Sequence, residues 1–238
     1  EDAIFRKLER LYCKAGHDGL VRISPPGRAV PGCVSAGASG LLSTAFDGPL
    51  GTVGRTSAMP FGGNISVIWN SGDVLAVDVP FALQGYVADR TQCFWDVAAP
   101  LPDEVRRAQE CCLAVEASIA ARLFPGVTPA GLWEEARAMA ASWGFADNFM
   151  GSGPDQARFV GHGIGLEMDE FPALARKFDI PLEENSVIAL EPKIALPPYG
   201  MVGVEHTFVV TPAGGHPINE GKIDGIFMEV ESLNMMWF

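Results

Sequence analysis

Two runs of β-forming residues stand out in the first half of the chain, between residues 74 and 94, and they meet at Leu83 and Gln84. This pattern predicts an antiparallel hairpin whose fold point lies between those two residues. Such a hairpin places Asp78 directly opposite Asp89. Carboxylates that face each other across a ladder repel, so the hairpin loses stability unless a cation lies between them. The alternative interpretation is a slipped register or two solvated acids.

The second half of the chain repeats this pattern. Residues 187–195 match residues 74–82, because in both segments four apolar residues precede a carboxylate and an alanine follows four positions later. The carboxylate of the second segment is Glu191. A proline-rich turn then leads to residues 201–210, another β-forming run, which carries Glu205. Two hairpins, each with two facing acids, indicate an internal duplication built around one charged centre.

The four acids of these hairpins point to metal binding. Burying four carboxylates requires cations close to them. Carboxylates combined with an imidazole suit borderline or hard divalent ions, so we expect Mn, Co, Fe(II) or Zn. Four acids and one histidine have the capacity for two such ions.

Three segments show helical periodicity. Apolar residues recur at helical spacing over residues 1–12 and predict an N-terminal helix. A second helix is predicted from Pro102 to Leu123, and a third begins after the capping residue Thr128 and ends before Gly144. The two later helices carry apolar faces that we expect to pack on the sheet. Strands and helices together predict the α+β class.

The remaining segments are less regular. Residues 24–66 are rich in Gly, Pro and Ser, and such a stretch either walls an active-site cleft or merely connects a sheet to a helix. The apolar residues 235–238 are expected to dock on the domain or on a partner. The chain opens without Met or a clear helix cap, from which we infer that an upstream segment was removed by truncation or by processing.

Composition limits the partners and the location. The chain has 238 residues, 48% of them hydrophobic, yet it contains no unbroken apolar run of membrane length. Its formal charge of -12 argues against binding to nucleic acid or to an anionic membrane surface. No signal-peptide pattern opens the sequence, and the five cysteines lack metal-site spacing. We therefore expect reduced thiols and a cytoplasmic protein.

A glycine-rich motif follows the predicted helices. His162 lies between Gly161 and Gly163, so it has little local steric cover, which suits a ligand or catalytic group; the alternative is a structural histidine. Four features occur in order: the two aspartates eleven residues apart, the Gly-His-Gly-Ile-Gly motif, the Glu-Pro after an apolar strand and the Glu-His-Thr strand. Together they resemble the pita-bread metallopeptidase family, which includes methionine aminopeptidase, prolidase, aminopeptidase P and creatinase. The resemblance covers roughly residues 1 to 215.

This resemblance implies a fold and a ligand set. The pita-bread fold is a curved antiparallel sheet of two pseudo-twofold halves, backed by helices, with the metal centre on its concave face. Asp78 would hold the second of two divalent ions, and Asp89 and Glu205 would bridge both ions. His162 and Glu191 would complete the first. Glu191 would also carry the proton from the attacking water to the leaving amine.

The chain departs from the family pattern at the expected catalytic residues. Asp169, which belongs to this group with His162 and Glu191, stands where family peptidases usually carry a second histidine. An ionised aspartate cannot donate a hydrogen bond to a developing oxyanion, so peptide hydrolysis would need another donor. The candidate donors are Arg55, Arg158, Lys193 and His206.

Three further sequence features concern whether this chain can hydrolyse peptides. Strand alternation places His206 on the sheet face opposite Glu205, which argues against a direct role for this histidine. The family usually has a histidine ahead of the first hairpin, but residues 48–77 contain none. Gln92 replaces an arginine that usually follows the Asp-x-Thr of the first hairpin.

Three hypotheses on function follow. The first is a dinuclear metallohydrolase of the aminopeptidase P or prolidase type, which cleaves an amide near the N-terminus of a small peptide. The second is a metal-dependent C–N hydrolase or lyase acting on a small non-peptide metabolite, which the missing histidines favour. The third is a binding module without catalysis, which the complete ligand set makes the weakest of the three.

The resemblance also suggests how the chain is organised. Family peptidases of the prolidase type have a separate N-terminal domain and often dimerise. We therefore expect residues 1–238 to be a single catalytic domain of a longer protein that forms a homodimer.

Overall fold

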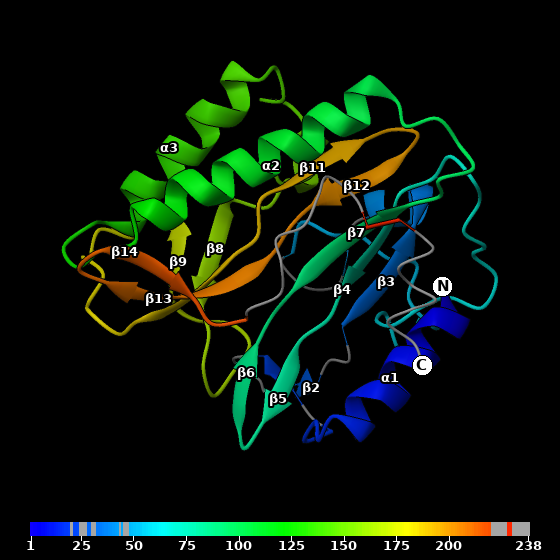
Figure 1. The fold of residues 1–238 in the computed structure, drawn as a ribbon, viewed down its shortest axis with the longest axis horizontal. Coiled ribbons are helices and arrows are strands. Elements are labelled where there is room, and N and C mark those ends of the chain that lie inside the picture. The colour runs from blue at the N-terminus through cyan, green and yellow to red at the C-terminus, as the bar shows by residue number, and fades with distance from the viewer. Residues whose placement is uncertain are drawn as a thin grey trace.

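The computed structural model describes residues 1–19, 21–23, 28–29, 32–42, 44, 48–219 and 228–229. The first half of the chain supplies three of the four strands of one main sheet, and the second half supplies the other main sheet. Three helices lie along the outer sides of these sheets (Figure 1). Helices and mainly antiparallel sheets confirm the predicted α+β class.

The sheet of the first half has the strand order β15-β7-β4-β3. In that order the strands are Met228–Glu229, Thr91–Trp95, Leu75–Asp78 and Cys33–Ala36. Helix α1 (Asp2–Lys14) confirms the N-terminal helix predicted from the periodicity, and it packs against β3. Along β4, Leu75 and Val77 join the cluster that contains Phe5 of α1, whereas Ala76 joins the main core. By the same alternation Asp78 points to the main-core side.

The first hairpin turns one residue later than the sequence pattern predicts. Its tip is formed by β5 (Phe81–Leu83) and β6 (Tyr86–Ala88), in which Leu83 opposes Tyr86. The turn residues are therefore Gln84 and Gly85, with φ angles of 54° and 84°. Two residues with positive φ form the type I′ turn, whose twist matches that of the flanking strands.

This turn corrects the predicted pairing of the two aspartates. Asp78 opposes Thr91, so the prediction that it lies directly opposite Asp89 is wrong. The error amounts to two residues of register. Because side chains alternate with a period of two, both aspartates still lie on the face expected for them.

The sheet of the second half has the order β14-β13-β10-β8-β9. In that order the strands are Gly214–Pro217, His206–Thr211, Val187–Leu190, Phe159–Gly163 and Glu170–Ala175. The β10–β13 hairpin continues into β11 (Lys193–Leu196) and β12 (Gly200–Gly203) without a change of register. Glu191 consequently falls opposite Glu205, as the sequence predicts for the second hairpin.

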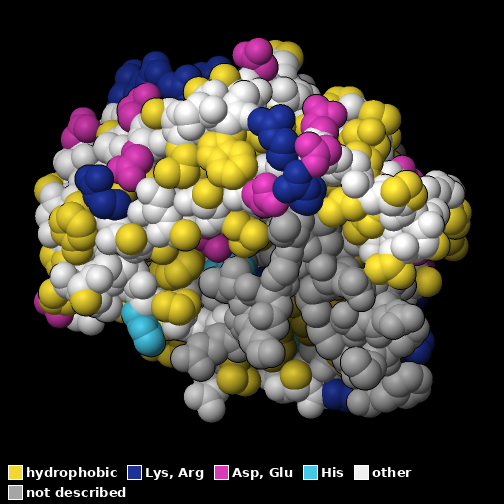
Figure 2. Space-filling view, turned by 45° about the horizontal axis from the view of Figure 1, so that its top comes forward, with side chains coloured by type: hydrophobic (Ala, Val, Ile, Leu, Met, Phe, Trp, Pro, Cys, Tyr) yellow, Lys and Arg dark blue, Asp and Glu magenta, His cyan; other side chains and the backbone are white. Residues whose placement is uncertain are grey.

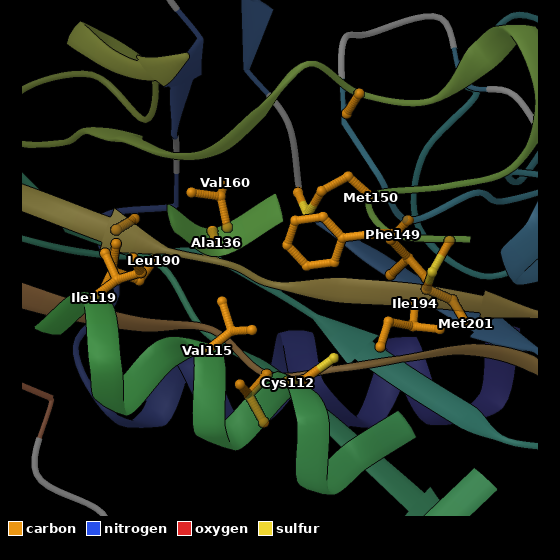
Figure 3. Close-up of a cluster of buried hydrophobic side chains, with 14 of the residues drawn as sticks. Cys112, Val115, Ile119, Ala136, Phe149, Met150, Val160, Leu190, Ile194 and Met201 are labelled. Atoms are coloured by element: carbon orange, nitrogen blue, oxygen red, sulfur yellow. The ribbon is translucent and has the colours of Figure 1, made fainter. Parts of the chain in front are cut away.

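Helices α2 (Asp103–Ala121) and α3 (Pro129–Ser142) cover the outer side of the second half (Figure 1). Thr128 caps α3 by accepting a hydrogen bond from the backbone N–H of Gly131, as expected for Thr before a first-turn proline. The apolar faces of both helices pack on the sheet in the main core. Figure 3 shows this core, in which Val115 and Ile119 of α2 lie below Leu190 of β10.

The other elements are short. They are β1 (Arg22–Ile23), β2 (Arg28–Ala29) and two 3₁₀ helices, η1 (Gly37–Leu41) and η2 (Gly153–Asp155). The predicted docking of residues 235–238 lies outside the described residues.

Three further observations concern the charges on the surface, the hydrophobicity of the helices and the cysteines. On the face in Figure 2, acidic side chains lie beside basic ones. Over the part of the chain that the structure describes, no helix is both long and apolar enough to cross a membrane. The five cysteines form no disulfide; Cys13 is exposed and the other four are buried.

Candidate metal centre

The four acids occupy matching places in the two hairpins. Each hairpin is divided into two strand pairs, β4–β7 with β5–β6 and β10–β13 with β11–β12. The acids lie where these pairs meet: Asp78 at the end of β4, Asp89 between β6 and β7, Glu191 between β10 and β11, and Glu205 between β12 and β13. This arrangement agrees with the repeat seen in the sequence.

All four acids line one pocket. His162 and Asp169 line the same pocket, and apolar side chains complete its walls. Two of these, Leu50 and Phe61, come from the irregular 24–66 segment. The segment therefore walls the cleft, and the interpretation of it as a mere connection is wrong for these residues.

Threonines join the two halves at the centre. The hydroxyl of Thr91 donates to Oε2 of Glu205 over 2.8 Å, and the backbone N–H of Glu205 donates to the carbonyl of Thr91. Thr207 has a matching role for Asp89, since its hydroxyl accepts from the backbone N–H of Asp89 at 3.2 Å. Acids from both hairpins are thereby held at fixed positions relative to each other.

His162 on β8 presents one ring nitrogen to the acids. Its Nδ1 lies 2.9 Å from the carbonyl oxygen of Gly163, so the tautomer with a proton on Nδ1 satisfies this contact. Nε2 is then free of its proton and lies 3.5 Å from Oε1 of Glu191 and 3.8 Å from Oε1 of Glu205. A backbone partner on one nitrogen and a metal on the other is the usual arrangement of a ligating histidine.

The flanking glycines have a packing role that the sequence analysis did not recognise. A Cβ atom at Gly161 would lie 2.3 Å from the carbonyl oxygen of Ala189, and one at Gly163 would lie 2.5 Å from that of Phe171. The neighbouring strands β10 and β9 therefore approach β8 too closely for any side chain. His162 itself is only 6% exposed, so it is well covered by the fold.

Three of these groups fit a metal ion. One ligand atom each from Asp89, His162 and Glu205 lies within 4.8 Å of the others, and all three residues are buried. Two carboxylates and an imidazole are suitable ligands for a borderline divalent ion. Among the described residues, this set is the one that meets the spacing; Asp78 and Glu191 are outside it.

Burial raises the pKa values of three of the carboxyl groups. Burial raises the pKa of Asp78 to about 6, although the attraction of Lys193 acts in the opposite direction. Burial, reinforced by Glu205 and Asp78, raises the pKa of Asp89 well above its ordinary value. Burial also raises the pKa of Glu205. A bound cation opposes all these shifts, because it favours the ionised carboxylates.

Lys193 brings a positive charge into the centre. Its Nζ donates to Oε2 of Glu191 over 2.7 Å and to Oε2 of Glu205 over 3.1 Å, and it lies 3.4 Å from Oδ2 of Asp78. The residue is 0% exposed. Burial alone lowers the pKa of Lys193, but the three carboxylates outweigh burial and raise it well above its ordinary value. The side chain is thus an ammonium ion.

The other residues proposed as catalytic groups or donors lie in different places. Asp169 lies at the pocket, with Oδ1 3.6 Å from Nδ1 of His162. Arg55 pairs with Asp2 of α1, and Arg158 lines a separate pocket beside α3. His206 points to α2, where its Nδ1 lies 2.9 Å from Oε1 of Glu116, which confirms the face predicted by strand alternation.

The sequence analysis did not predict the position of Lys193. It named this lysine only as a candidate oxyanion donor, whereas the structure places its ammonium group among the acids. The available signal was the spacing of two residues between Glu191 and Lys193, because residues at i and i+2 of an extended segment share a face. The same spacing relates Thr91 to Asp89 and Thr207 to Glu205.

Comparisons with known proteins agree with this geometry. The sequence model of "Metallopeptidase family M24" matches residues 33–212. The Xaa-Pro dipeptidase of Pyrococcus furiosus is 29% identical over 176 residues, which are 74% of this chain and 48% of that protein. The Xaa-Pro dipeptidase of Lactobacillus delbrueckii is 28% identical over 179 residues, 75% of this chain and 46% of that protein. The chain thus spans about half the length of these curated relatives.

Solved structures show the same architecture. The X-Pro aminopeptidase of Thermotoga maritima superposes with a TM-score of 0.74 at 24% identity, covering 96% of this chain and 55% of that one. The Xaa-Pro dipeptidase of Bacillus anthracis superposes with a TM-score of 0.75 at 22% identity, covering 95% of this chain and 54% of that one. These likenesses confirm the pita-bread fold.

Proposed function

Because the chain belongs to metallopeptidase family M24, we propose that it is a divalent-metal-dependent hydrolase that cleaves an amide bond near the N-terminus of small peptides, of the Xaa-Pro aminopeptidase or dipeptidase type. The observation that carries this proposal is the buried convergence of Asp89, His162 and Glu205 from both halves of the fold. The names of the curated relatives support the peptide class.

The residues around this set suit hydrolysis. A divalent ion held by Asp89, His162 and Glu205 would supply Lewis acidity and an activated water. Glu191 lies at the same pocket, buried and 3.5 Å from the imidazole of His162, where it can take a proton from water and return it to a leaving amine. Lys193 keeps Oε2 of this carboxylate in place, which leaves Oε1 directed toward His162.

Three finer expectations belong to the same proposal. The metal would be Mn, Co, Fe or Zn. The sequence led us to expect five ligands for two ions, but the two of those ligands outside the grouped set, Asp78 and Glu191, contact Lys193, which bears on whether a second ion is bound. We also retain the expectation of a reducing, cytoplasmic compartment, which the unpaired thiols support. The expectation of a homodimer is kept from the family resemblance alone.

A second candidate keeps the metal and changes the substrate. Asp169 places a carboxylate at the pocket where a donor to the oxyanion is expected, and it is 45% exposed at its side chain. This observation favours C–N hydrolysis or a lyase step on a small non-peptide metabolite, a reaction that tolerates or uses the carboxylate of Asp169.

Peptide hydrolysis separates the two candidates. Purified protein supplied with MnCl₂ or CoCl₂ is incubated with Xaa-Pro dipeptides and tripeptides, and released amino acids are measured by chromatography. Metal-dependent release that disappears in Glu191→Gln supports the peptidase. Bound metal without release from any peptide would direct the assignment to the small-molecule enzyme.

A further inference from the structure

We propose that the ammonium group of Lys193 takes the place of one divalent ion, so that the centre binds a single ion through Asp89, His162 and Glu205. This inference rests on the proposed function, since it concerns the number of ions at the same site. It replaces the expectation of two ions drawn from the sequence.

The contacts of Lys193 overlap the ligands expected for the second ion. Those ligands were Asp78, Asp89 and Glu205. The ammonium nitrogen contacts two of them, at 3.4 Å from Asp78 and 3.1 Å from Glu205, and a third acid, Glu191, at 2.7 Å. An ammonium group has three N–H donors; Lys193 donates to Glu191 and Glu205 and forms an ion pair with Asp78. A divalent ion at these oxygens would meet a like charge at contact distance.

Lys193 is held where it lies. Its backbone N–H contacts the sulfur of Met150 at 3.4 Å, and its carbonyl accepts from the N–H of Met150 over 2.7 Å. Its stem lies over Gly203, its partner across β11 and β12. A Cβ atom at Gly203 would come within 2.6 Å of Cγ of Lys193, so the missing side chain makes room for the lysine. The side chain could leave the acids only by vacating a fully buried place.

Ligand spacing also favours one ion, because the described residues give one set within 4.8 Å and Asp78 is not in it. Lys193 then acts as a positioning residue that neutralises Asp78 and orients Glu191.

The test counts ions. Wild-type protein and Lys193→Met, in which an apolar side chain of similar length replaces the lysine, are purified with MnCl₂ present and freed of loose metal. Manganese per chain is measured by mass spectrometry, and electron paramagnetic resonance distinguishes isolated Mn(II) from a coupled pair. We expect about one isolated ion in the wild type and about two coupled ions in Lys193→Met, since the four acids then lack their built-in cation.

Each outcome has a distinct meaning. Two coupled ions in the wild type would overturn this inference and leave the proposed metallohydrolase intact. One ion in both proteins would also overturn it, because removing the lysine would not have opened a second place. No manganese in the wild type would instead contradict the proposed function. If Lys193→Met fails to fold, two coupled ions in the wild type would still overturn the inference.

Discussion

The ammonium nitrogen of Lys193 lies 2.7 Å from Oε2 of Glu191, two residues earlier in the chain. Both side chains are buried, and the contact links the expected proton carrier to a fixed positive charge. The metal-free protein therefore depends on this lysine to offset its crowded carboxylates.

Replacing Lys193 is expected to destabilise the metal-free protein strongly. Lys193→Met should cost about 3–5 kcal/mol of unfolding free energy, because it leaves buried carboxylates without a partner. Mn(II) should reduce the loss, since an ion that binds the folded state stabilises it. Urea unfolding with and without MnCl₂ measures both effects, and Lys14→Met on the exposed face of α1 is the control. An equal loss under both conditions would contradict the role given to this lysine.

The pair formed by Glu116 and His206 is expected to stabilise the fold and to have no part in metal binding. Both residues are 3% exposed, and the pair lies between α2 and β13. Glu116→Ala should cost about 1–3 kcal/mol, because it leaves a buried imidazole nitrogen unpaired. The manganese content should stay at the wild-type value. A loss of manganese with preserved stability would show that His206 acts in the centre after all.

The turn at Gln84 and Gly85 is expected to control the register of the first hairpin. Gly85→Ala should destabilise the protein by about 1 kcal/mol, because alanine is strained at a φ of 84°. Gln84→Asn should instead raise stability by less than about 1 kcal/mol, since Asn-Gly is the preferred type I′ sequence. Thermal unfolding of both variants gives the comparison. Stabilisation by Gly85→Ala would be incompatible with the observed turn.

Position 169 is expected to limit peptide turnover. Asp169→His would place a hydrogen-bond donor at the pocket, and one such donor to an oxyanion changes kcat by about 10²–10³. We expect a rise of at least about tenfold in kcat for Xaa-Pro peptides, with a smaller change in KM. Manganese content serves as the control, because Asp169 lies near His162. Unchanged or lower kcat with normal metal content would count against a donor function at this position.

Much of the fold followed from patterns in the sequence. The helices were predicted because each has a continuous apolar face, and Thr128 marks the start of α3. The faces of Asp78, Asp89 and His206 were predicted because side chains alternate along a strand. The pairing of Asp78 was not predicted correctly, because the register depends on whether the turn begins at Leu83 or at Gln84. Gln is also an uncommon residue at positive φ.

The candidate site was predicted less completely. The acids and His162 could be named because their order in the chain resembles a family pattern. The contacts of Lys193 could not be predicted, because they depend on how closely the two hairpins approach each other and on the space above Gly203. The glycines around His162 suggested an open site, but they reflect the close approach of neighbouring strands.

The most direct test of the account is the manganese content of the wild type and of Asp89→Asn, with Asp179→Asn at an exposed position as the matched control. Asp89 supplies one of the three grouped ligand atoms, so its amide should bind an ion poorly. We predict about one Mn(II) per chain in the wild type and the control, and almost none in Asp89→Asn, with peptide hydrolysis following the metal. Undiminished manganese in Asp89→Asn, or none in the wild type, would contradict the metal centre on which the proposed function depends.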